Sequence, residues 1–204
     1  MSNLLIGPFL IWLPKIAYAV ILILATYSYV KSKSWIKKLI IIIIIFQVLY
    51  ALALTVSQYY VWSTNDLTRI LLTEPTEQGV IFNHRHGYFA LYVLGRFWLE
   101  VLITWLCAGL FYYLLCQLKK YREEFFEIDE PELGLLTTLL SGWPGFVVFL
   151  PLALISLVLY SLFQKVWKKE SYTPVGWPLI VAAAITLLFI EKFSVILPLG
   201  VLKI

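Results

Sequence analysis

The stretch LIIIIIIFQVLYALALTVSQYYVW, residues 39–62, contains no charged side chain. An α-helix rises about 1.5 Å per residue, so roughly 20 apolar residues cross the hydrocarbon core of a bilayer. The stretch therefore predicts a transmembrane helix. The whole chain agrees with this, because 61% of its 204 residues are hydrophobic and only 14% are charged. So few charged residues leave too little polar surface to coat a soluble globule of this size.

A second uncharged stretch, residues 133–164, is too long for one crossing. As a single helix it would measure about 48 Å, against a hydrocarbon core of about 30 Å. Gly142-Trp143-Pro144-Gly145 lies near its middle, and proline flanked by glycine breaks a helix where a tight connection is needed. We therefore expect a hairpin broken at Gly142–Gly145.

Together these patterns predict an all-α fold, a polytopic integral membrane helical bundle of about six membrane segments. No linker divides the chain, so residues 1–204 are expected to form a single membrane domain. The expected segments are residues 9–30, 39–62, 87–118, the two arms of the hairpin, and 176–190.

Clusters of lysine predict the orientation of this bundle. Lys31, Lys33, Lys37 and Lys38 crowd the connection between the first two segments, and basic residues in short loops mark the cytoplasmic side. The N-terminus is therefore expected outside. With the hairpin, the cluster around Lys168 falls on the same cytoplasmic side as the first loop.

The densest polar feature is the run of six carboxylates between Glu123 and Glu132, directly before the hairpin. Such a run is typical of a solvated loop. After it, however, comes a short apolar helix ending in Ser141-Gly-Trp143, and Thr173-Pro-Val-Gly-Trp-Pro178 opens the last segment. This order resembles the C-terminal half of the type IV prepilin peptidases, over about residues 127–190. In that family a Gly-x-Gly-Asp motif precedes an apolar helix ending in Leu-Gly-Trp, and a Pro-x-Gly-Pro turn starts a later helix.

The resemblance implies a membrane aspartic endopeptidase in a prokaryotic plasma membrane, with Asp129 and Glu130 as the candidate catalytic residues. Glu130 falls at the position of the family aspartate, but Glu127-Ile-Asp-Glu130 has neither glycine of the motif. The family's first aspartate is expected in the earlier cytoplasmic loop, which holds only lysines, serines, a tryptophan and an isoleucine. A water activated for hydrolysis needs two neighbouring carboxylates of different proton affinity. The expectation is therefore a retained scaffold whose peptidase activity is weakened or lost.

Arg96 and Glu100 interrupt the third segment and lie four residues apart, so they are expected to share one helix face and pair. Ionisable groups at membrane depth usually face the protein interior or a watery cavity. Two interpretations stay open. The pair fixes helix packing, or it lines a polar path or ligand site together with Thr104 and Gln47.

The two histidines, His84 and His86, precede the third segment at its outer end. Two histidines without further ligands fall short of the three or four ligands of a typical zinc site, so they are weak metal candidates. Solvated interfacial histidines, lipid headgroup binding and acyl transfer are the other interpretations. The last of these rests on a His-x-His-Gly pattern that resembles the His-Pro-His-Gly of diacylglycerol acyltransferases.

No glycine-rich phosphate loop or nucleophile elbow occurs, and the basic residues lie beside apolar segments as orientation signals. We therefore expect no cofactor and no nucleic-acid partner. The expected partners are the lipid bilayer and other membrane proteins. The leading functional hypothesis is a prepilin-peptidase-like protein linked to pilus or secretion-apparatus assembly. The alternative is a non-enzymatic accessory or transport subunit that uses a polar intramembrane site.

Overall fold

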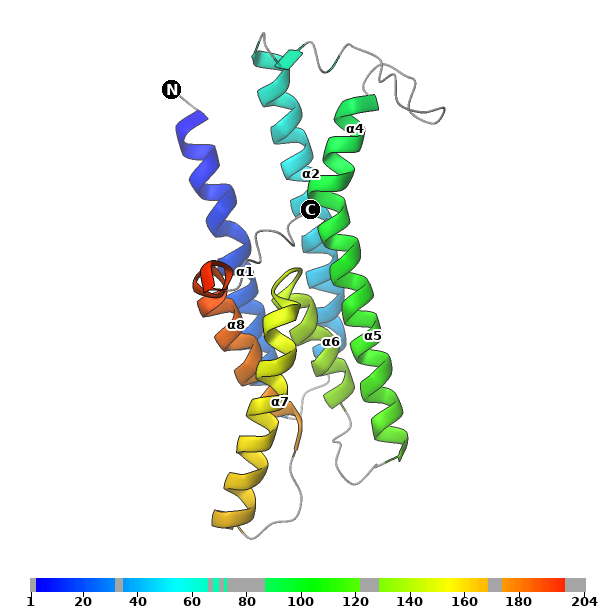
Figure 1. Ribbon diagram of the computed structural model, residues 1–204, viewed down its shortest axis with the longest axis vertical. Helices are drawn as coiled ribbons and strands as arrows, with labels where there is room; N and C mark the ends of the chain where they lie inside the picture. Colours follow the sequence, from blue (N-terminus) through cyan, green and yellow to red (C-terminus); the bar gives the residue numbers. More distant parts are fainter. Residues whose placement is uncertain are drawn as a thin grey trace.

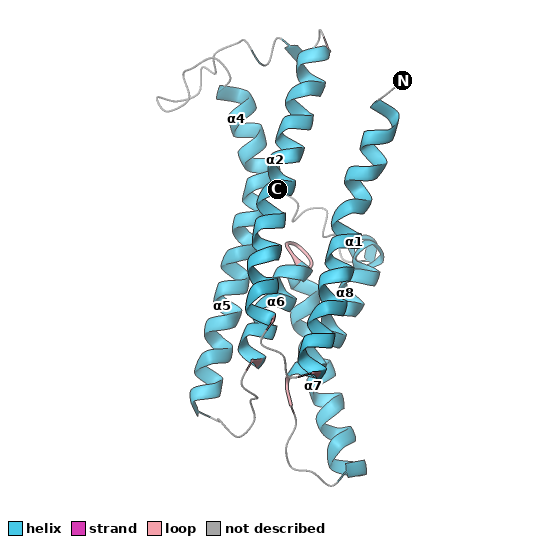
Figure 2. Ribbon diagram, turned by 180° about the vertical axis from the view of Figure 1, so that it is seen from behind, coloured by secondary structure: helices cyan, strands magenta, loops and turns pink. Residues whose placement is uncertain are grey.

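The computed structural model describes residues 3–31, 35–65, 68, 69, 72, 87–121, 129–168 and 174–196, and within them it contains helices and no strand (Figures 1 and 2). The all-α prediction is confirmed for this part of the chain. In chain order the helices are α1 (Asn3–Val30), α2 (Ile36–Thr64), α4 (Gly87–Val93), the π-helical turn η1 (Leu94–Trp98), α5 (Leu99–Tyr121), α6 (Glu130–Ser141), α7 (Phe146–Phe163), the π-helical turn η3 (Gln164–Lys168) and α8 (Gly176–Ile196).

Four of these helical stretches are long and apolar enough to cross a bilayer. They are Trp12–Val30, Ile36–Thr64, Tyr88–Tyr121 and Phe146–Val166. Their outer faces expose many large aliphatic and aromatic side chains, as a lipid-facing surface requires. These features indicate an integral membrane protein.

The predicted count of six membrane segments is not confirmed. Helix α6 has 12 residues, which corresponds to a length of about 18 Å and is too short for a crossing. The apolar part of α8, Gly176–Ile190, is also shorter than the four long stretches. Helix α6 is therefore short, and α8 has only a short apolar part; both pack beside the long helices.

The predicted break in the hairpin is confirmed. Helix α6 ends at Ser141 and α7 begins at Phe146. Gly142 has a φ of 60°, a left-handed conformation that strongly favours glycine, and the Trp143–Pro144 peptide bond is cis. The tip of the hairpin lies about midway along α2 and the α4–α5 helix (Figure 1).

Helix α6 forms the centre of the bundle. It packs against α5, α8 and α2, and its side chains from Leu133 to Leu140 are mostly buried. Gly134 allows the close approach to α5, because a Cβ atom there would overlap Leu115 Cδ1. Because α6 is central, its packing positions Glu130 at its lower end. It also positions Gly142–Gly145 at its upper end, which we call the hairpin tip.

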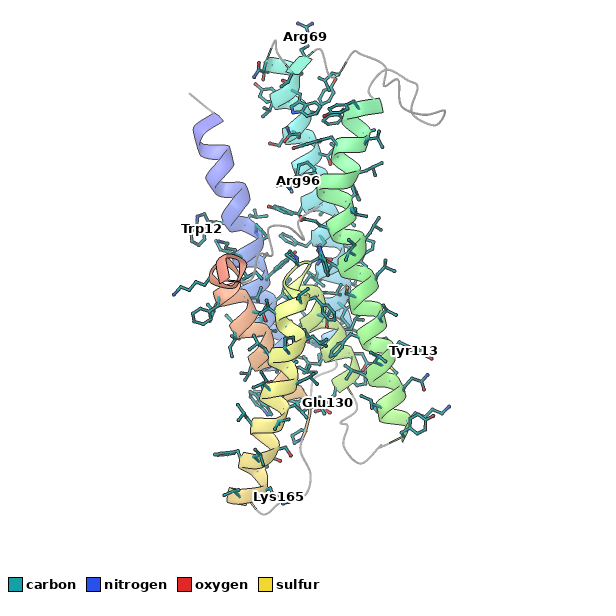
Figure 3. All side chains as sticks on the ribbon, in the orientation of Figure 1. Trp12, Arg69, Arg96, Tyr113, Glu130 and Lys165 are labelled. Carbon is teal, nitrogen blue, oxygen red and sulfur yellow. The ribbon has the colours of Figure 1, made fainter. Side chains whose placement is uncertain are left out.

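Two labelled basic residues lie at opposite ends of the bundle. Lys165 lies at the lower end and Arg69 at the opposite end (Figure 3). Helix α1 runs down to Val30 at the lower end, and α2 returns upward from Ile36 (Figure 1). This arrangement agrees with the predicted topology of the first two segments and the hairpin. That the lower end is cytoplasmic, with the N-terminus outside, stays a prediction.

Candidate functional site

Glu130 is the first residue of α6, and its side chain is fully buried, at 0% exposure. Its Oε1 accepts a hydrogen bond from the Tyr29 hydroxyl at 3.0 Å and one from the backbone N–H of Gly176 at 2.7 Å. A buried carboxylate is costly unless donors surround it, and both donors here meet one oxygen. The carboxylate therefore connects the end of α1, the start of α6 and the start of α8. We call Tyr29, Glu130 and Gly176 the Glu130 cluster.

The sequence around Gly176 suits this contact. The peptide N–H of Gly176 lies in the first turn of α8, where backbone N–H groups have no partner within the helix. A Cβ atom at Gly176 would overlap the ring of Tyr29, so only glycine lets that ring lie against the start of α8. The Tyr29 ring also packs edge-on against Trp177, with ring centroids 5.9 Å apart. Glycine at this position thus permits both donors to reach Glu130.

The other two acids at this end of α6 lie in different surroundings. Asp129 is half-buried and precedes the helix as its N-cap, without a side-chain capping hydrogen bond. The Oε1 of Glu132 lies 3.7 Å from the Nζ of Lys37, in an ion pair whose lysine is largely exposed. Exposed pairs of this kind contribute about 0–1 kcal/mol. Asp129 and Glu130 adjoin in sequence, and the Tyr29 hydroxyl and the Gly176 N–H both donate to Glu130 Oε1.

A second polar site surrounds the hairpin tip, at the other end of α6. The buried amide of Gln47 donates from Nε2 to the Leu139 carbonyl at 3.0 Å and accepts at Oε1 from the Trp105 indole N–H at 2.8 Å. The buried Thr104 hydroxyl donates to the Glu100 carbonyl and accepts the Trp143 backbone N–H, both at 2.8 Å. Two polar side chains, one from α2 and one from α5, thus hold the hairpin tip in place.

These contacts border a cavity of about 190 Å³, which we call the hairpin-tip cavity. Its lining comes from α1, α2, the η1–α5 helix and the hairpin. The polar side chains in it are those of Tyr18, Gln47, Tyr50, Glu100, Thr104, Ser141 and Trp143. The structure therefore brings together three of the four residues predicted for a polar intramembrane site, namely Glu100, Thr104 and Gln47.

Arg96, the fourth, lies elsewhere. It is exposed within η1 and does not line the cavity, whereas Glu100 is half-buried. In this turn the Leu99 N–H bonds to the Leu94 carbonyl five residues back, so residues four apart are not aligned as in a regular α-helix. No ion pair joins Arg96 to Glu100 among the described residues, and the predicted pair is not confirmed.

The weak metal candidates His84 and His86, and the acidic residues Glu123, Glu124 and Glu127, lie outside the described residues. Within the described part of the chain, no group of three or more His, Cys, Asp and Glu side chains is placed to hold a metal ion.

Sequence reasoning missed Tyr29 and Gly176, and it did not foresee that Gln47 and Thr104 would hold the hairpin tip. Tyr29 and Glu130 are separated by 101 positions, and no local pattern indicates such a contact. A signal did exist for Gln47, which is an amide within a long apolar stretch. Buried amides of this kind need hydrogen-bond partners, so the residue marks a packing contact or a site.

Comparisons of the chain with protein-family models, curated proteins and solved structures gave no match. The resemblance to prepilin peptidases therefore rests on the motif residues of the chain alone.

Proposed function

We propose that this chain is a membrane protein of prepilin-peptidase-like architecture in which Glu130 stabilises the fold instead of activating water. In this proposal it serves pilus or secretion-apparatus assembly as a non-catalytic subunit. It lies in a prokaryotic plasma membrane with its N-terminus outside.

The observation that carries the proposal is the burial of Glu130. In a carboxylate dyad the general base must reach the attacking water, whereas the Glu130 carboxylate is fully buried and its Oε1 already accepts two hydrogen bonds. The connection between α1 and α2, where the resemblance expects the first aspartate, holds no carboxylate. These features favour a structural role for Glu130.

The scaffold half of the proposal has separate support. The two stretches that carry the resemblance, the one around Glu130 and the one around Gly176, hydrogen bond to each other. This contact joins two stretches that lie 46 positions apart and supports the proposal that they belong to one scaffold.

The test is a cleavage assay on the full chain reconstituted in lipid nanodiscs, with a prepilin-like leader peptide and mass-spectrometric detection. We expect no cleavage. We also expect the double variant Asp129→Asn, Glu130→Gln to accumulate and to support the cellular role, because glutamine keeps an acceptor oxygen for Tyr29 and Gly176. Cleavage that disappears in the double variant would establish a working dyad and overturn the proposal.

A second candidate function, an accessory or transport subunit with an intramembrane site, is favoured by the hairpin-tip cavity. Glu100 is the one carboxylate among the described residues that line the cavity, and it lies in a segment long enough to cross the bilayer. Intramembrane carboxylates commonly mark ion or substrate sites. The expected result is that Glu100→Gln accumulates normally but loses the cellular role, while the control Arg96→Gln keeps it. Normal function of Glu100→Gln would contradict this candidate.

A further inference from the structure

Two cavities of the bundle share part of their lining. The hairpin-tip cavity has a volume of about 190 Å³. A second cavity, of about 430 Å³, is lined by α1, the end of α6 and α8, and we call it the α1–α8 cavity. Tyr18 of α1 and Ser141 of α6 line both cavities. The two cavities are therefore neighbours, with these two side chains in the wall between them.

The α1–α8 cavity begins near one edge of the membrane. Its lining includes Trp12 and Lys15, and Trp12 is the first residue of the α1 stretch that is long enough to cross a bilayer. Trp12 is exposed, and the Nζ of Lys15 lies over its ring, 4.7 Å from the centroid. Tryptophan and lysine are typical of the interface between membrane and water. The mouth of this cavity is therefore expected at the upper end of the α1 stretch.

The hairpin-tip cavity lies deeper. Gln47, which lines it, comes 11 residues after Ile36, the first residue of α2. This spacing corresponds to about 17 Å along the helix, which is close to the middle of a hydrocarbon core of about 30 Å. Gly142 and Trp143 of the hairpin tip also line the cavity. Non-helical backbone at membrane depth occurs where protein buries it or where it lines a water-filled cavity, so a hydrated cavity suits this turn.

Both cavities contain polar groups that suit water. Apolar cavities stay dry, whereas a polar one holds water once it offers about 10–15 Å³ to the centre of a water molecule. The hydroxyls of Ser141 and Thr186 each donate to a backbone carbonyl at 2.8 Å, and their oxygens keep lone pairs that can accept from water. Each cavity also contains an ionisable side chain, Lys15 in one and Glu100 in the other. Such groups in membrane segments usually face the protein interior or a watery cavity.

We infer that the two cavities form one water-filled vestibule, open near Trp12 and closed at the hairpin tip. The vestibule admits water and water-sized solutes to the middle of the membrane from the side on which α1 begins (Figure 1). This inference deepens the second candidate function and rests on it for its purpose, because an intramembrane site needs a route from water. The vestibule gives that site an entry from one side only.

The experiment is silver labelling of single cysteines in sealed membrane vesicles of known orientation, in the background Cys107→Ser, Cys116→Ser. Silver ion is small, stays in water and blocks thiolates. The thiols left unblocked are then measured by maleimide labelling after denaturation in SDS. The test variants are Ala19→Cys in the α1–α8 cavity, Ser141→Cys in the shared wall and Val101→Cys in the hairpin-tip cavity.

Two of the test positions have a matched neighbour outside the vestibule. Val20 follows Ala19 on α1, and Leu102 follows Val101 on α5; both neighbours are exposed, and neither lines the two cavities. Applied from the side on which α1 begins, silver should block the three test cysteines at least about tenfold faster than Val20→Cys and Leu102→Cys, because thiols in hydrocarbon stay protonated. Silver applied from the opposite side should block none of them.

A bulky side chain at the mouth tests whether the cavities are continuous. Ala19→Trp adds bulk to the α1–α8 cavity and removes room for water, so we expect it to slow the blocking of Val101→Cys at least about tenfold. Val20→Trp is the control and should leave that rate unchanged. Ser141→Cys exchanges one atom only, which keeps the position in the wall testable if a larger substitution prevents folding.

The other outcomes refute the inference. Blocking of Ala19→Cys alone would show two separate cavities, and blocking of none of the test cysteines would show that packing or lipid excludes water. Equal blocking of Val101→Cys and Leu102→Cys would show general access without a vestibule, and blocking from the opposite side would contradict the position of the mouth.

This result is distinguishable from the test of the second candidate function. One-sided blocking together with normal function of Glu100→Gln would contradict that function and leave the vestibule standing. Loss of function in Glu100→Gln without blocking of the test cysteines would do the reverse.

Discussion

Replacing Glu130 separates the structural role of this carboxylate from a catalytic one. Glu130→Gln keeps an oxygen that accepts from the Tyr29 hydroxyl and the Gly176 N–H. Glu130→Leu removes the acceptor while keeping a side chain of similar bulk. If Glu130 stabilises the fold, the two variants should differ strongly in stability, whereas a purely catalytic residue would tolerate both.

The expected magnitudes come from the two hydrogen bonds. In Glu130→Leu, the half-buried Tyr29 hydroxyl and the buried Gly176 N–H both lose this acceptor, and an unsatisfied buried donor costs about 1–3 kcal/mol. Removing a buried carboxylate offsets part of this, so we expect a net loss of at least about 2 kcal/mol in the free energy of unfolding. Glu130→Gln should lose only about 1 kcal/mol, because neutral hydrogen bonds are weaker than charge-assisted ones.

The assay is unfolding in mixed micelles by SDS titration, monitored by tryptophan fluorescence. Glu132→Leu is the matched control, since its ion pair with the exposed Lys37 is worth at most about 1 kcal/mol. Tyr29→Phe completes a double-mutant cycle with Glu130→Leu, and we expect a coupling energy of about 1–2 kcal/mol. Strictly additive losses, or a Glu130→Leu protein as stable as the unaltered one, would refute the role of the Glu130 cluster.

Three further predictions concern the hairpin and the topology. Thr104→Val removes the acceptor of the Trp143 N–H and should lower the free energy of unfolding by about 1–3 kcal/mol. Thr55→Val is the control and should be near neutral in the same titration, because the Thr55 hydroxyl donates to the Ala51 carbonyl within α2. Gly142→Ala should lower the free energy of unfolding by about 1–2 kcal/mol, because the φ of Gly142 is positive. A neutral or stabilising effect would contradict this turn. Gly109→Ala is the control, because Gly109 lies in open space on α5. Cysteines introduced at Lys120 and Lys168 should react with a membrane-impermeant label from one side and a cysteine at Thr76 from the other, and labelling of positions 168 and 76 from the same side would exclude the hairpin.

The sequence predicted the long helices well, because an uncharged stretch in a chain of this composition has few alternatives to a membrane helix. Residues 39–62 fall within α2, and the glycine-flanked Pro144 marks the break between α6 and α7. The helix begins at Ile36, earlier than predicted, and includes Lys37 and Lys38 in its first turn. Lysines at a membrane edge can extend their ammonium groups toward water, so charge there does not end the helix.

The sequence was less informative about depth and pairing. The pattern of apolar and polar residues does not show whether a short apolar helix such as α6 crosses the membrane or ends inside it. The Arg96–Glu100 pair was expected from regular helical spacing, and the π-helical turn at residues 94–98 changes that spacing. Composition gives no warning of such a turn. Glu130, predicted as catalytic, is placed by partners that only the folded chain brings together.

The Glu130 cluster also has a consequence for biogenesis. Its three members come from positions 29, 130 and 176, so the two donors of Glu130 are made at very different times during synthesis from the N-terminus. When α6 first inserts, Glu130 can bond to Tyr29, but the second donor is still unmade. A nascent chain that ends before Gly176 therefore has Glu130 without this donor. Arrival of α8 completes the cluster, so a contact that joins the first described helix to α8 forms only late in synthesis.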